Sequence, residues 1–203
     1  GAGSVSEKSE EFGQYNGLHE KGGFLIGEGT LRSRGEDGAY WNLDASNLGL
    51  DTRAVDAEGG KQGSYKLRFK YDESIHRIWD KVLTPFAGSG GAALTLPAGF
   101  VKAGTTGAMT SLAGSLQSVE LGTQRKLLGV GASWNRTSQW EYAVNLRHEK
   151  REGSILRTGG AFFVNSAQLI DPVDYVTDQV DASASYAGKK FQMKLAYYGS
   201  KFR

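Results

Sequence analysis

Large apolar residues and charged residues alternate with a period of two in several segments of the chain. In the segment 64–72, aromatic or aliphatic residues occupy the odd positions, and Lys66, Arg68 and Lys70 occupy even positions. Successive side chains of a β-strand point to opposite faces of its sheet, whereas a helix would scatter these residues around its circumference. The pattern therefore predicts a strand with one apolar face and one basic face.

The same alternation recurs along most of the chain and predicts an all-β fold. The segments that carry it are 24–33, 40–48, 64–72, 125–135, 140–150, 176–186 and 190–202. Residues 161–164 are a candidate for an eighth strand, and no segment has the pattern of a helix. The short polar or glycine-containing stretches 34–38, 136–139 and 187–189 predict hairpin turns between antiparallel neighbours.

Two connections are long, at 74–124 and 151–175. Counted in up-and-down order they follow the third and fifth predicted strands, so both emerge on one side, opposite the short turns. Outer-membrane barrels have this asymmetry, with long extracellular loops and short periplasmic turns. Two connections depart from it, because 34–38 is short on the long-loop side and 49–63 is fairly long on the other side.

Aromatic residues cluster near the ends of the predicted strands on their apolar side. They are Trp41, Tyr65, Tyr71, Trp134, Trp140, Tyr142, Tyr186 and Tyr197. Membrane barrels carry aromatic girdles at both interfaces, whereas a soluble β-sandwich buries the middles of its strands. The sequence thus predicts an up-and-down antiparallel transmembrane β-barrel at 23–203, after a periplasmic segment at 1–22. The mean hydropathy of −0.41 is compatible with a barrel whose polar and apolar faces average out.

Composition excludes several kinds of chemistry. The chain has no cysteine, which excludes disulfides, thiolate metal sites, iron–sulfur clusters and covalent attachment of haem c. His19, His76 and His148 lie far apart without ligand spacing, and the glycine-rich stretches 13–17 and 88–91 lack the context of a phosphate loop. A net charge of +2 does not indicate nucleic acid. We therefore expect a protein that is not an enzyme and holds no metal or cofactor of its own.

Six short blocks in a fixed order carry a resemblance to a known family. They are 12–18 (FGQYNGL), 47–53 (NLGLDTR), 71–73 (YDE), 84–90 (TPFAGSG), 94–99 (LTLPAG) and 171–175 (DPVDY). Each block alone is weak, but with this order and spacing the chain resembles the decahaem-associated outer-membrane β-barrel proteins of the MtrB/PioB type from residue 12 to its end. Members of that family are much longer and some carry cysteines near the amino terminus. The chain therefore resembles the amino-terminal part of a larger barrel.

The resemblance implies a sheath that houses and insulates a multihaem c-type cytochrome. Such a porin–cytochrome conduit carries electrons across the bacterial outer membrane, and the haem c belongs to the partner. A haem chain must be kept from hydrocarbon, where its peptide and charged groups find no partners, whereas a closed barrel satisfies its own backbone. An extracellular multihaem cytochrome is a second implied partner, with the segment 74–124 at the outer surface. The alternative for this segment is a loop that is disordered or folded into the lumen.

The face assignment follows from this reading. The residues predicted to line the lumen and contact the cytochrome are Lys66, Arg68, Lys70, Arg147 and Lys194, on the same side as Glu28, Arg32, Asn42 and Asp44. The residues predicted to face lipid are Tyr65, Leu67, Phe69, Tyr71, Trp140, Tyr142, Phe191, Met193, Leu195 and Tyr197. A basic residue on the lipid side would cost ~2–4 kcal/mol at the midplane, which fixes the register.

Two other functions fit the alternating pattern. A general outer-membrane porin or channel would pass small solutes, with the basic residues setting an anion preference. A soluble β-sandwich binding module would use Trp41 or Trp140 as a stacking platform, for instance for carbohydrate. Fractionation with detergent separates the soluble module from the barrels, and a haem stain separates the sheath from the open pore.

Overall fold

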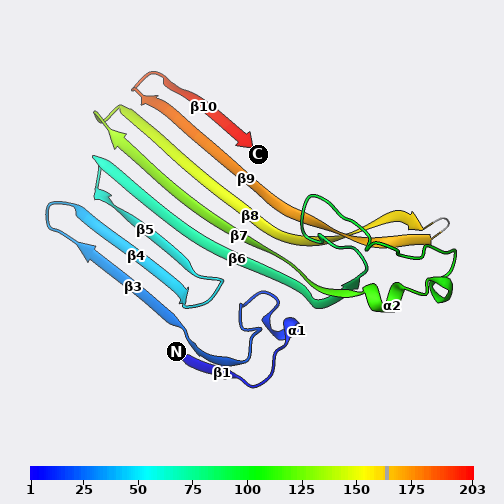
Figure 1. Cartoon of the computed structure of the whole chain (residues 1–203). Coiled ribbons are helices and arrows are strands. Elements are labelled where there is room, and N and C mark those ends of the chain that lie inside the picture. The colour runs from blue at the N-terminus through cyan, green and yellow to red at the C-terminus, as the bar shows by residue number, and fades with distance from the viewer. Residues whose placement is uncertain (163–164) are drawn as a thin grey trace.

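The computed structural model describes residues 1–162 and 165–203, and most of this chain is β-structure. Within these residues eight antiparallel strands form one sheet in the sequential order β3 to β10, which we call the main sheet (Figure 1). Each strand pairs with its neighbours in sequence, so the predicted up-and-down antiparallel topology is confirmed. Nowhere in these two ranges is there a helix long and apolar enough to cross a membrane.

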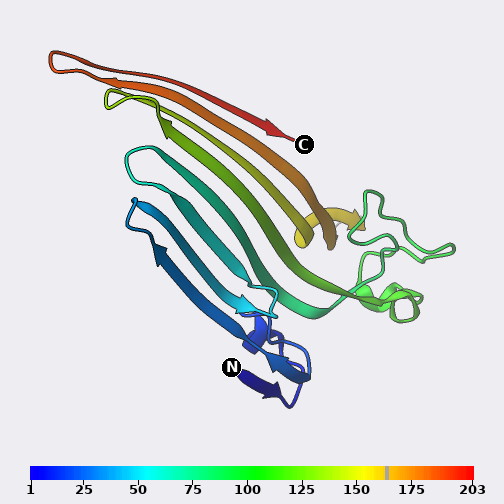
Figure 2. The ribbon, with the colours of Figure 1, turned by 90° about the vertical axis from the view of Figure 1, so that its left-hand side faces the viewer.

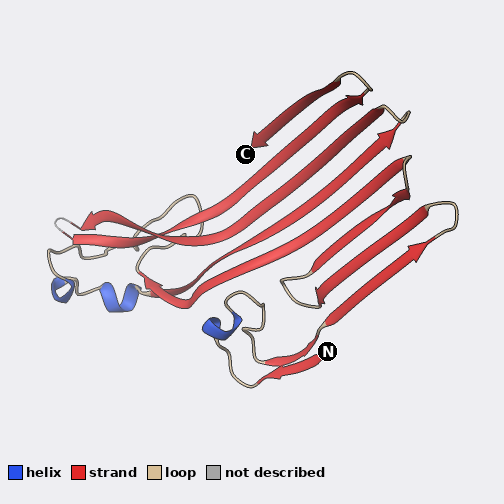
Figure 3. Cartoon of the chain, turned by 180° about the vertical axis from the view of Figure 1, so that it is seen from behind, coloured by secondary structure: helices blue, strands red, loops and turns tan. Residues whose placement is uncertain are grey.

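The main sheet contains strands of very different lengths. They are β3 (Gly27–Arg34), β4 (Ala39–Leu48), β5 (Ala54–Lys61), β6 (Tyr65–Thr84), β7 (Gln117–Asn135), β8 (Trp140–Phe162), β9 (Asn165–Ala187) and β10 (Gln192–Phe202). Outside it lie the paired strands β1 (Ala2–Val5) and β2 (Gly22–Leu25) and the short helices α1 (Glu10–Gly13), η1 (Thr106–Ala108) and α2 (Leu112–Ser115). The sequence predicted no helix, because segments of three or four residues carry no helical periodicity. Figure 3 shows the helices at one end of the main sheet.

The other end of the main sheet carries only short turns. These turns are 35–38, 62–64, 136–139 and 188–191, and the hairpins predicted at 34–38, 136–139 and 187–189 are confirmed. In the first turn, Gly38 has a φ of 82°, which favours glycine. Asp37 accepts hydrogen bonds from the Ala39 N–H and from Lys61, both at 3.2 Å, and these two partners lower the pKa of Asp37.

Strand β5 is absent from the sequence prediction, which treated 49–63 as a connection. Its apolar positions are Val55, Ala57 and Gly59, so the strand lacks the large residues that marked the other segments. With β5 in place, the two exceptions to the loop asymmetry disappear. The turns 35–38, 62–64, 136–139 and 188–191 now lie at one end, and the connections 49–53 and 85–116 lie at the other.

Much of the chain predicted as long loops is strand. Strand β6 continues to Thr84 and β7 begins at Gln117, which reduces the expected loop 74–124 to residues 85–116. The expected loop 151–175 is wrong as well, because these residues continue the ladder between β8 and β9. Their apolar residues occur in adjacent pairs, such as Ile155–Leu156 and Leu169–Ile170, so a period of two is not visible in the sequence. The candidate strand 161–164 lies partly outside the described residues, with 161–162 ending β8.

Residues 85–116 pack against the far part of the β8–β9 hairpin, and together with 151–175 we call them the distal lobe. Phe86 and Met109 are buried at its centre. The partly buried residues around them are Leu94, Leu96, Phe100, Ala103, Leu112, Ala167 and Leu169. The Gly90 N–H also donates to the Ile170 carbonyl at 3.4 Å. The loop is therefore fixed to β9 by its own small hydrophobic core.

The amino-terminal segment lies at the same end as the distal lobe. The Arg77 N–H donates to the Gln14 carbonyl at 3.0 Å, and the Tyr15 ring stacks on His76 with centroids 4.7 Å apart. The predicted periplasmic place of 1–22 and outer-surface place of 74–124 are therefore incompatible. The unrecognised β5 is the reason, since one further strand moves the loop to the opposite side of the sheet.

Trp41 provides a test of the packing on β4 and β5. Its ring lies over Gly59, where an added Cβ would clash with the indole. We expect Gly59→Val to lower the free energy of unfolding by about 1–3 kcal/mol, because overpacking forces the ring away. Urea unfolding in lipid vesicles, followed by tryptophan fluorescence, measures this. Gly29→Val is the control, since a Cβ at Gly29 meets nothing within 4 Å; equal losses would contradict the proposed clash.

Candidate functional site: the two faces of the main sheet

The cross-strand register divides the side chains of the main sheet into two faces. Residues paired directly across antiparallel strands share a face, and the pairs Tyr65–Trp134, Trp134–Tyr142 and Tyr142–Ala184 link β6 to β9. Following such pairs places every residue predicted to face lipid on one side, which we call the apolar face. Lys66, Arg68, Lys70, Arg147 and Lys194 all lie on the other side, the charged face. Each predicted set thus shares one side of the sheet, and the assignment of these sides to lipid and lumen stays a prediction.

A row of aromatic rings crosses the apolar face near the short turns. Tyr142 lies between Trp134 and Trp140, with ring centroids 6.1 and 5.9 Å away. The row continues from Trp140 to Tyr186 and from Tyr186 to Phe191, at 5.0 Å in each case. Aromatic pairs of this kind add roughly 0.5–1.5 kcal/mol each beyond their buried area. Together the rings form a continuous border where the strands meet the turns, as a membrane girdle does.

This aromatic border is inclined to the strands. Successive pairs link Tyr65 on β6 to Leu195 on β10, yet the border residue on that side is Phe191, which is four residues nearer the turn. In the other direction Trp41 on β4 lies in line with Leu67, two residues beyond Tyr65. The border thus shifts by about one residue per strand, the shear that accompanies a strand tilt of about 36°.

Standard strand dimensions give the same tilt. A rise of ~3.4 Å per residue against a spacing of ~4.8 Å between strands corresponds to a border inclined by about 35°. Transmembrane barrels hold their strands at ≈ 35–45° to the membrane normal. A border inclined in this way lies level when the strands are tilted, so all its rings reach one depth.

Charged residues end the apolar face on the side away from the turns. They are Glu73, Lys126, His148, Asp178 and Lys201, one on each strand from β6 to β10. On β8 the distance from Trp140 to His148 is about 27 Å along the strand, or roughly 22 Å along the normal of a tilted barrel. The apolar belt of a transmembrane barrel is about 25 Å tall. The apolar face therefore has the height that a bilayer requires.

On the charged face the cations of β6 are paired with carboxylates of β5. Glu58 lies 3.0 Å from Arg68 and 3.5 Å from Lys66, and Asp56 lies 3.5 Å from Lys70. Further pairs on this face are Arg32–Asp44 at 2.8 Å, Arg125–Asp72 at 2.5 Å and Arg147–Glu149 at 2.6 Å. The sequence predicted a purely basic face for β6 because it did not predict β5, which carries the acidic partners. The observed wall is a mosaic of paired charges.

Lys194 differs from the other basic residues predicted to line the lumen. It is exposed on β10, and it has no ion pair within the residues that the structure describes. The histidines are held in separate local contacts: His148 lies 2.6 Å from Asp178, His76 3.0 Å from Tyr15, and buried His19 3.3 Å from Glu20. In residues 1–162 and 165–203, no group of three or more potential ligands could hold a metal ion.

Side chains of the apolar face are open to the surroundings. Leu195 is 73% exposed and Tyr197 is 65% exposed, and Figure 2 shows the main sheet as one curved layer. A β-sandwich would bury these rows against a second sheet. Trp140 lines a recess beside the turn 136–139, but no second layer covers the rows of the apolar face among the described residues. The soluble β-sandwich alternative is therefore wrong.

Comparison with known proteins decides the family. Residues 4–203 match the family described as outer membrane beta-barrel porin, MtrB/PioB. The chain is also 35% identical over 170 residues to outer membrane protein MtrB of Shewanella baltica (strain OS185). The chain belongs to the MtrB/PioB family. The predicted family, fold class and location in the bacterial outer membrane are confirmed.

The alignment with the Shewanella baltica protein covers 84% of this chain but only 24% of that protein, so the chain spans about a quarter of that relative. In the part that the structure describes, the outer strands β3 and β10 do not pair with each other, and the main sheet stays open. An open sheet edge is not tolerated in hydrocarbon. The open sheet agrees with the expectation that these strands are part of a larger MtrB/PioB barrel.

Depth measurements test the inclined border. We expect spin labels at Tyr65→Cys and Phe191→Cys to lie at equal depth near the interface, although the two positions are in different rows. Leu195→Cys should lie about 11 Å deeper, although Leu195 is in line with Tyr65. Power-saturation electron paramagnetic resonance in vesicles measures these depths, and this chain has no competing cysteine. Equal depths for Tyr65 and Leu195 would show strands that are not tilted.

Proposed function

We propose that this chain forms part of the wall of an outer-membrane barrel that houses and insulates a multihaem c-type cytochrome. The barrel and cytochrome together form a porin–cytochrome conduit for electron transfer across the outer membrane. The observation that carries the proposal is the pairing of a broad, charge-balanced face with an apolar face of bilayer height. In this arrangement the apolar face contacts lipid and the charged face lines the lumen.

The physical role of the sheath is to replace hydrocarbon around the cytochrome. Peptide groups and charges of a haem protein cannot be satisfied by lipid tails, whereas the strands of a closed barrel satisfy one another. The charged face supplies donors, acceptors and room for water. This chain lacks the cysteines that attach haem c, so the haem belongs to the partner and the sheath itself performs no redox step and no catalysis.

The paired charges change how the partner would be held. Lys66, Arg68 and Lys70 already have carboxylates within 3.5 Å, so they are no simple basic patch for haem propionates. Exposed ion pairs contribute only ~0–1 kcal/mol each, and such pairs exchange partners at low cost. We infer that the cytochrome is held by many weak contacts over a large area, with Lys194 as a further cation.

The same pairing argues against a porin with an anion preference. A selective pore uses rings of charge that its own wall leaves uncompensated, whereas most cations of this wall face a carboxylate. A nonselective pore for small solutes remains the alternative function, and the presence of haem separates the two.

The extracellular cytochrome, the second partner in the proposal, would meet the outer end of the sheet. With residues 1–22 in the periplasm, as the sequence predicts, the distal lobe lies on the periplasmic side, which reverses the usual placement of long loops outside the cell. The short turns then form the outer rim, and an extracellular partner would contact them and the end of the enclosed cytochrome.

The main proposal predicts that haem accompanies the barrel. The complete protein, purified in mild detergent from its own membranes, should carry a multihaem c-type cytochrome that is visible by haem stain and by its absorption. Cells that cannot mature c-type cytochromes provide the control and should yield a haem-free preparation. A purified barrel without haem from normal cells would contradict the sheath and favour the open pore.

The face assignment predicts opposite outcomes for two neighbouring residues on β6. Phe69→Lys should block membrane assembly, because a lysine in the lipid-facing row costs ~2–4 kcal/mol at the midplane. Lys70→Gln should leave the barrel inserted and reduce the haem that co-purifies. Heat-modifiable gel mobility reports insertion and the haem stain reports capture. Similar behaviour of the two variants would refute the assignment of the faces.

A further inference from the structure

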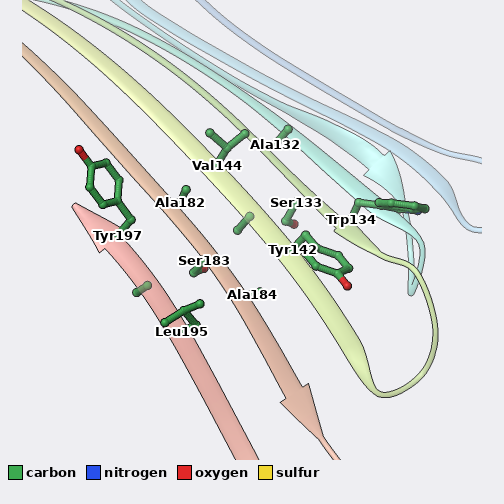
Figure 4. A pocket seen from close by; sticks show the side chains of 12 residues that line it. Ala132, Ser133, Trp134, Tyr142, Val144, Ala182, Ser183, Ala184, Leu195 and Tyr197 are labelled. Atoms are coloured by element: carbon green, nitrogen blue, oxygen red, sulfur yellow. The ribbon is translucent and has the colours of Figure 1, made fainter. Parts of the chain in front are cut away.

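The apolar face is hollowed where β7 to β10 carry small residues. Ala132, Ala182 and Ala184 form the floor of a recess of about 680 Å³. Figure 4 shows Trp134 and Tyr142 near one end of this recess; its other lining side chains include Val144, Leu195 and Tyr197. Each alanine leaves space that a leucine or phenylalanine fills elsewhere on this face. The result is a trough that follows the strands.

A second recess continues the trough toward the charged border. It has a volume of about 580 Å³, and it shares Tyr197 with the first recess. Its apolar lining is Leu128, Val130, Leu146, Val180 and Gly199. From Trp134 to Leu128 the combined trough runs about 20 Å along the strands, or roughly 16 Å along the normal of a tilted barrel. This length is most of the roughly 22 Å height of the apolar face, so the trough extends from the charged border past the middle of the bilayer.

The trough ends at a cluster with an excess of positive charge. His148, Asp178 and Lys201 line its end. His148 and Arg203 both contact the carboxylate of Asp178, at 2.6 and 2.5 Å, whereas Lys201 has no ion pair within the described residues. Lys201 and Arg203 together outweigh one carboxylate, so an anionic group is favoured at this level. Both cations lie where the apolar face ends, at the height of lipid headgroups.

We propose that this trough is a binding site for an anionic phospholipid, with an acyl chain along Ala132, Ala182 and Ala184 and its phosphate at Lys201. The inference rests on the proposed contact of the apolar face with lipid. Association within a bilayer depends on close packing, and small residues allow it. A narrow trough with a single excess charge suits a two-chain, one-phosphate lipid better than lipid A, which has more chains and phosphates.

The charged end is tested with variants of opposite sign. The complete protein is delipidated in detergent and titrated with phosphatidylglycerol, and bound lipid is counted by native mass spectrometry. Lys201→Gln should weaken binding about fivefold, the effect of one basic residue near a lipid surface. Asp178→Asn should strengthen it, since the cluster loses a negative charge. Phosphatidylcholine should bind less than phosphatidylglycerol to the unmodified protein.

The apolar part is tested by filling the trough. Ala182→Leu should abolish the preference for phosphatidylglycerol, whereas Ala57→Leu makes the same change on the same face outside the trough and should leave binding unaltered. Both variants stay apolar, so heat-modifiable mobility should show normal insertion. Equal binding to Lys201→Gln, Ala182→Leu and the unmodified protein would overturn the proposal, as would tighter binding of lipid A.

The test is independent of the cytochrome. If haem co-purifies but no variant changes lipid binding, the lipid site alone is overturned. Selective phosphatidylglycerol binding by a barrel that carries no haem would overturn the sheath alone. Failure of Phe69→Lys and Lys70→Gln to differ would remove the face assignment on which both depend.

Discussion

Backbone hydrogen bonding in hydrocarbon is the constraint on which the structure depends. Lipid offers no partner for an N–H or C=O, so every strand in the bilayer must be paired on both sides. Strands β4 to β9 meet this need within the sheet, and the ladder also fixes the register. Register in turn decides which residues share a face, so a shift of a single residue would bring Lys66 and Arg68 into the row of Leu67 and Phe69.

The two faces follow different rules because they meet different surroundings. The apolar face has aromatic rings at one border and charged residues at the other. Between these borders its side chains are apolar but differ in size, and the small ones form the trough. The charged face is mixed, and neighbouring strands neutralise one another, as Glu58 does for Lys66 and Arg68. A face of paired charges has no large excess of one sign, so it does not repel a hydrated surface of either charge. The sheet thus resembles a boundary between two solvents more than a conventional core.

The sequence predicted the faces well because alternation with large residues survives in β6, β8 and β10. It failed at β5, where Ala57 and Gly59 replace large apolar residues and only pairing with β6 creates the strand. It failed again at 151–175, because apolar residues occur there in adjacent pairs, such as Leu169 and Ile170, and do not alternate with polar ones. Neither the ion pairs of Glu58 nor the trough over Ala182 could be foreseen, since both arise between strands. The positions of the aromatic residues, in contrast, are given by the sequence, and the strand tilt follows from them once the register is known.

The unequal ends of the main sheet have a mechanical consequence. At one end, turns of three or four residues follow directly after the aromatic border, so the wall stops almost at the membrane surface. At the other end, the long hairpins, the distal lobe and the amino-terminal segment extend well beyond the charged border of the apolar face (Figure 1). The two ends of the main sheet therefore differ in how far the chain extends beyond the apolar face. A molecule that approaches along the membrane normal meets the strands at once at the short turns, whereas at the other end it meets the distal lobe first.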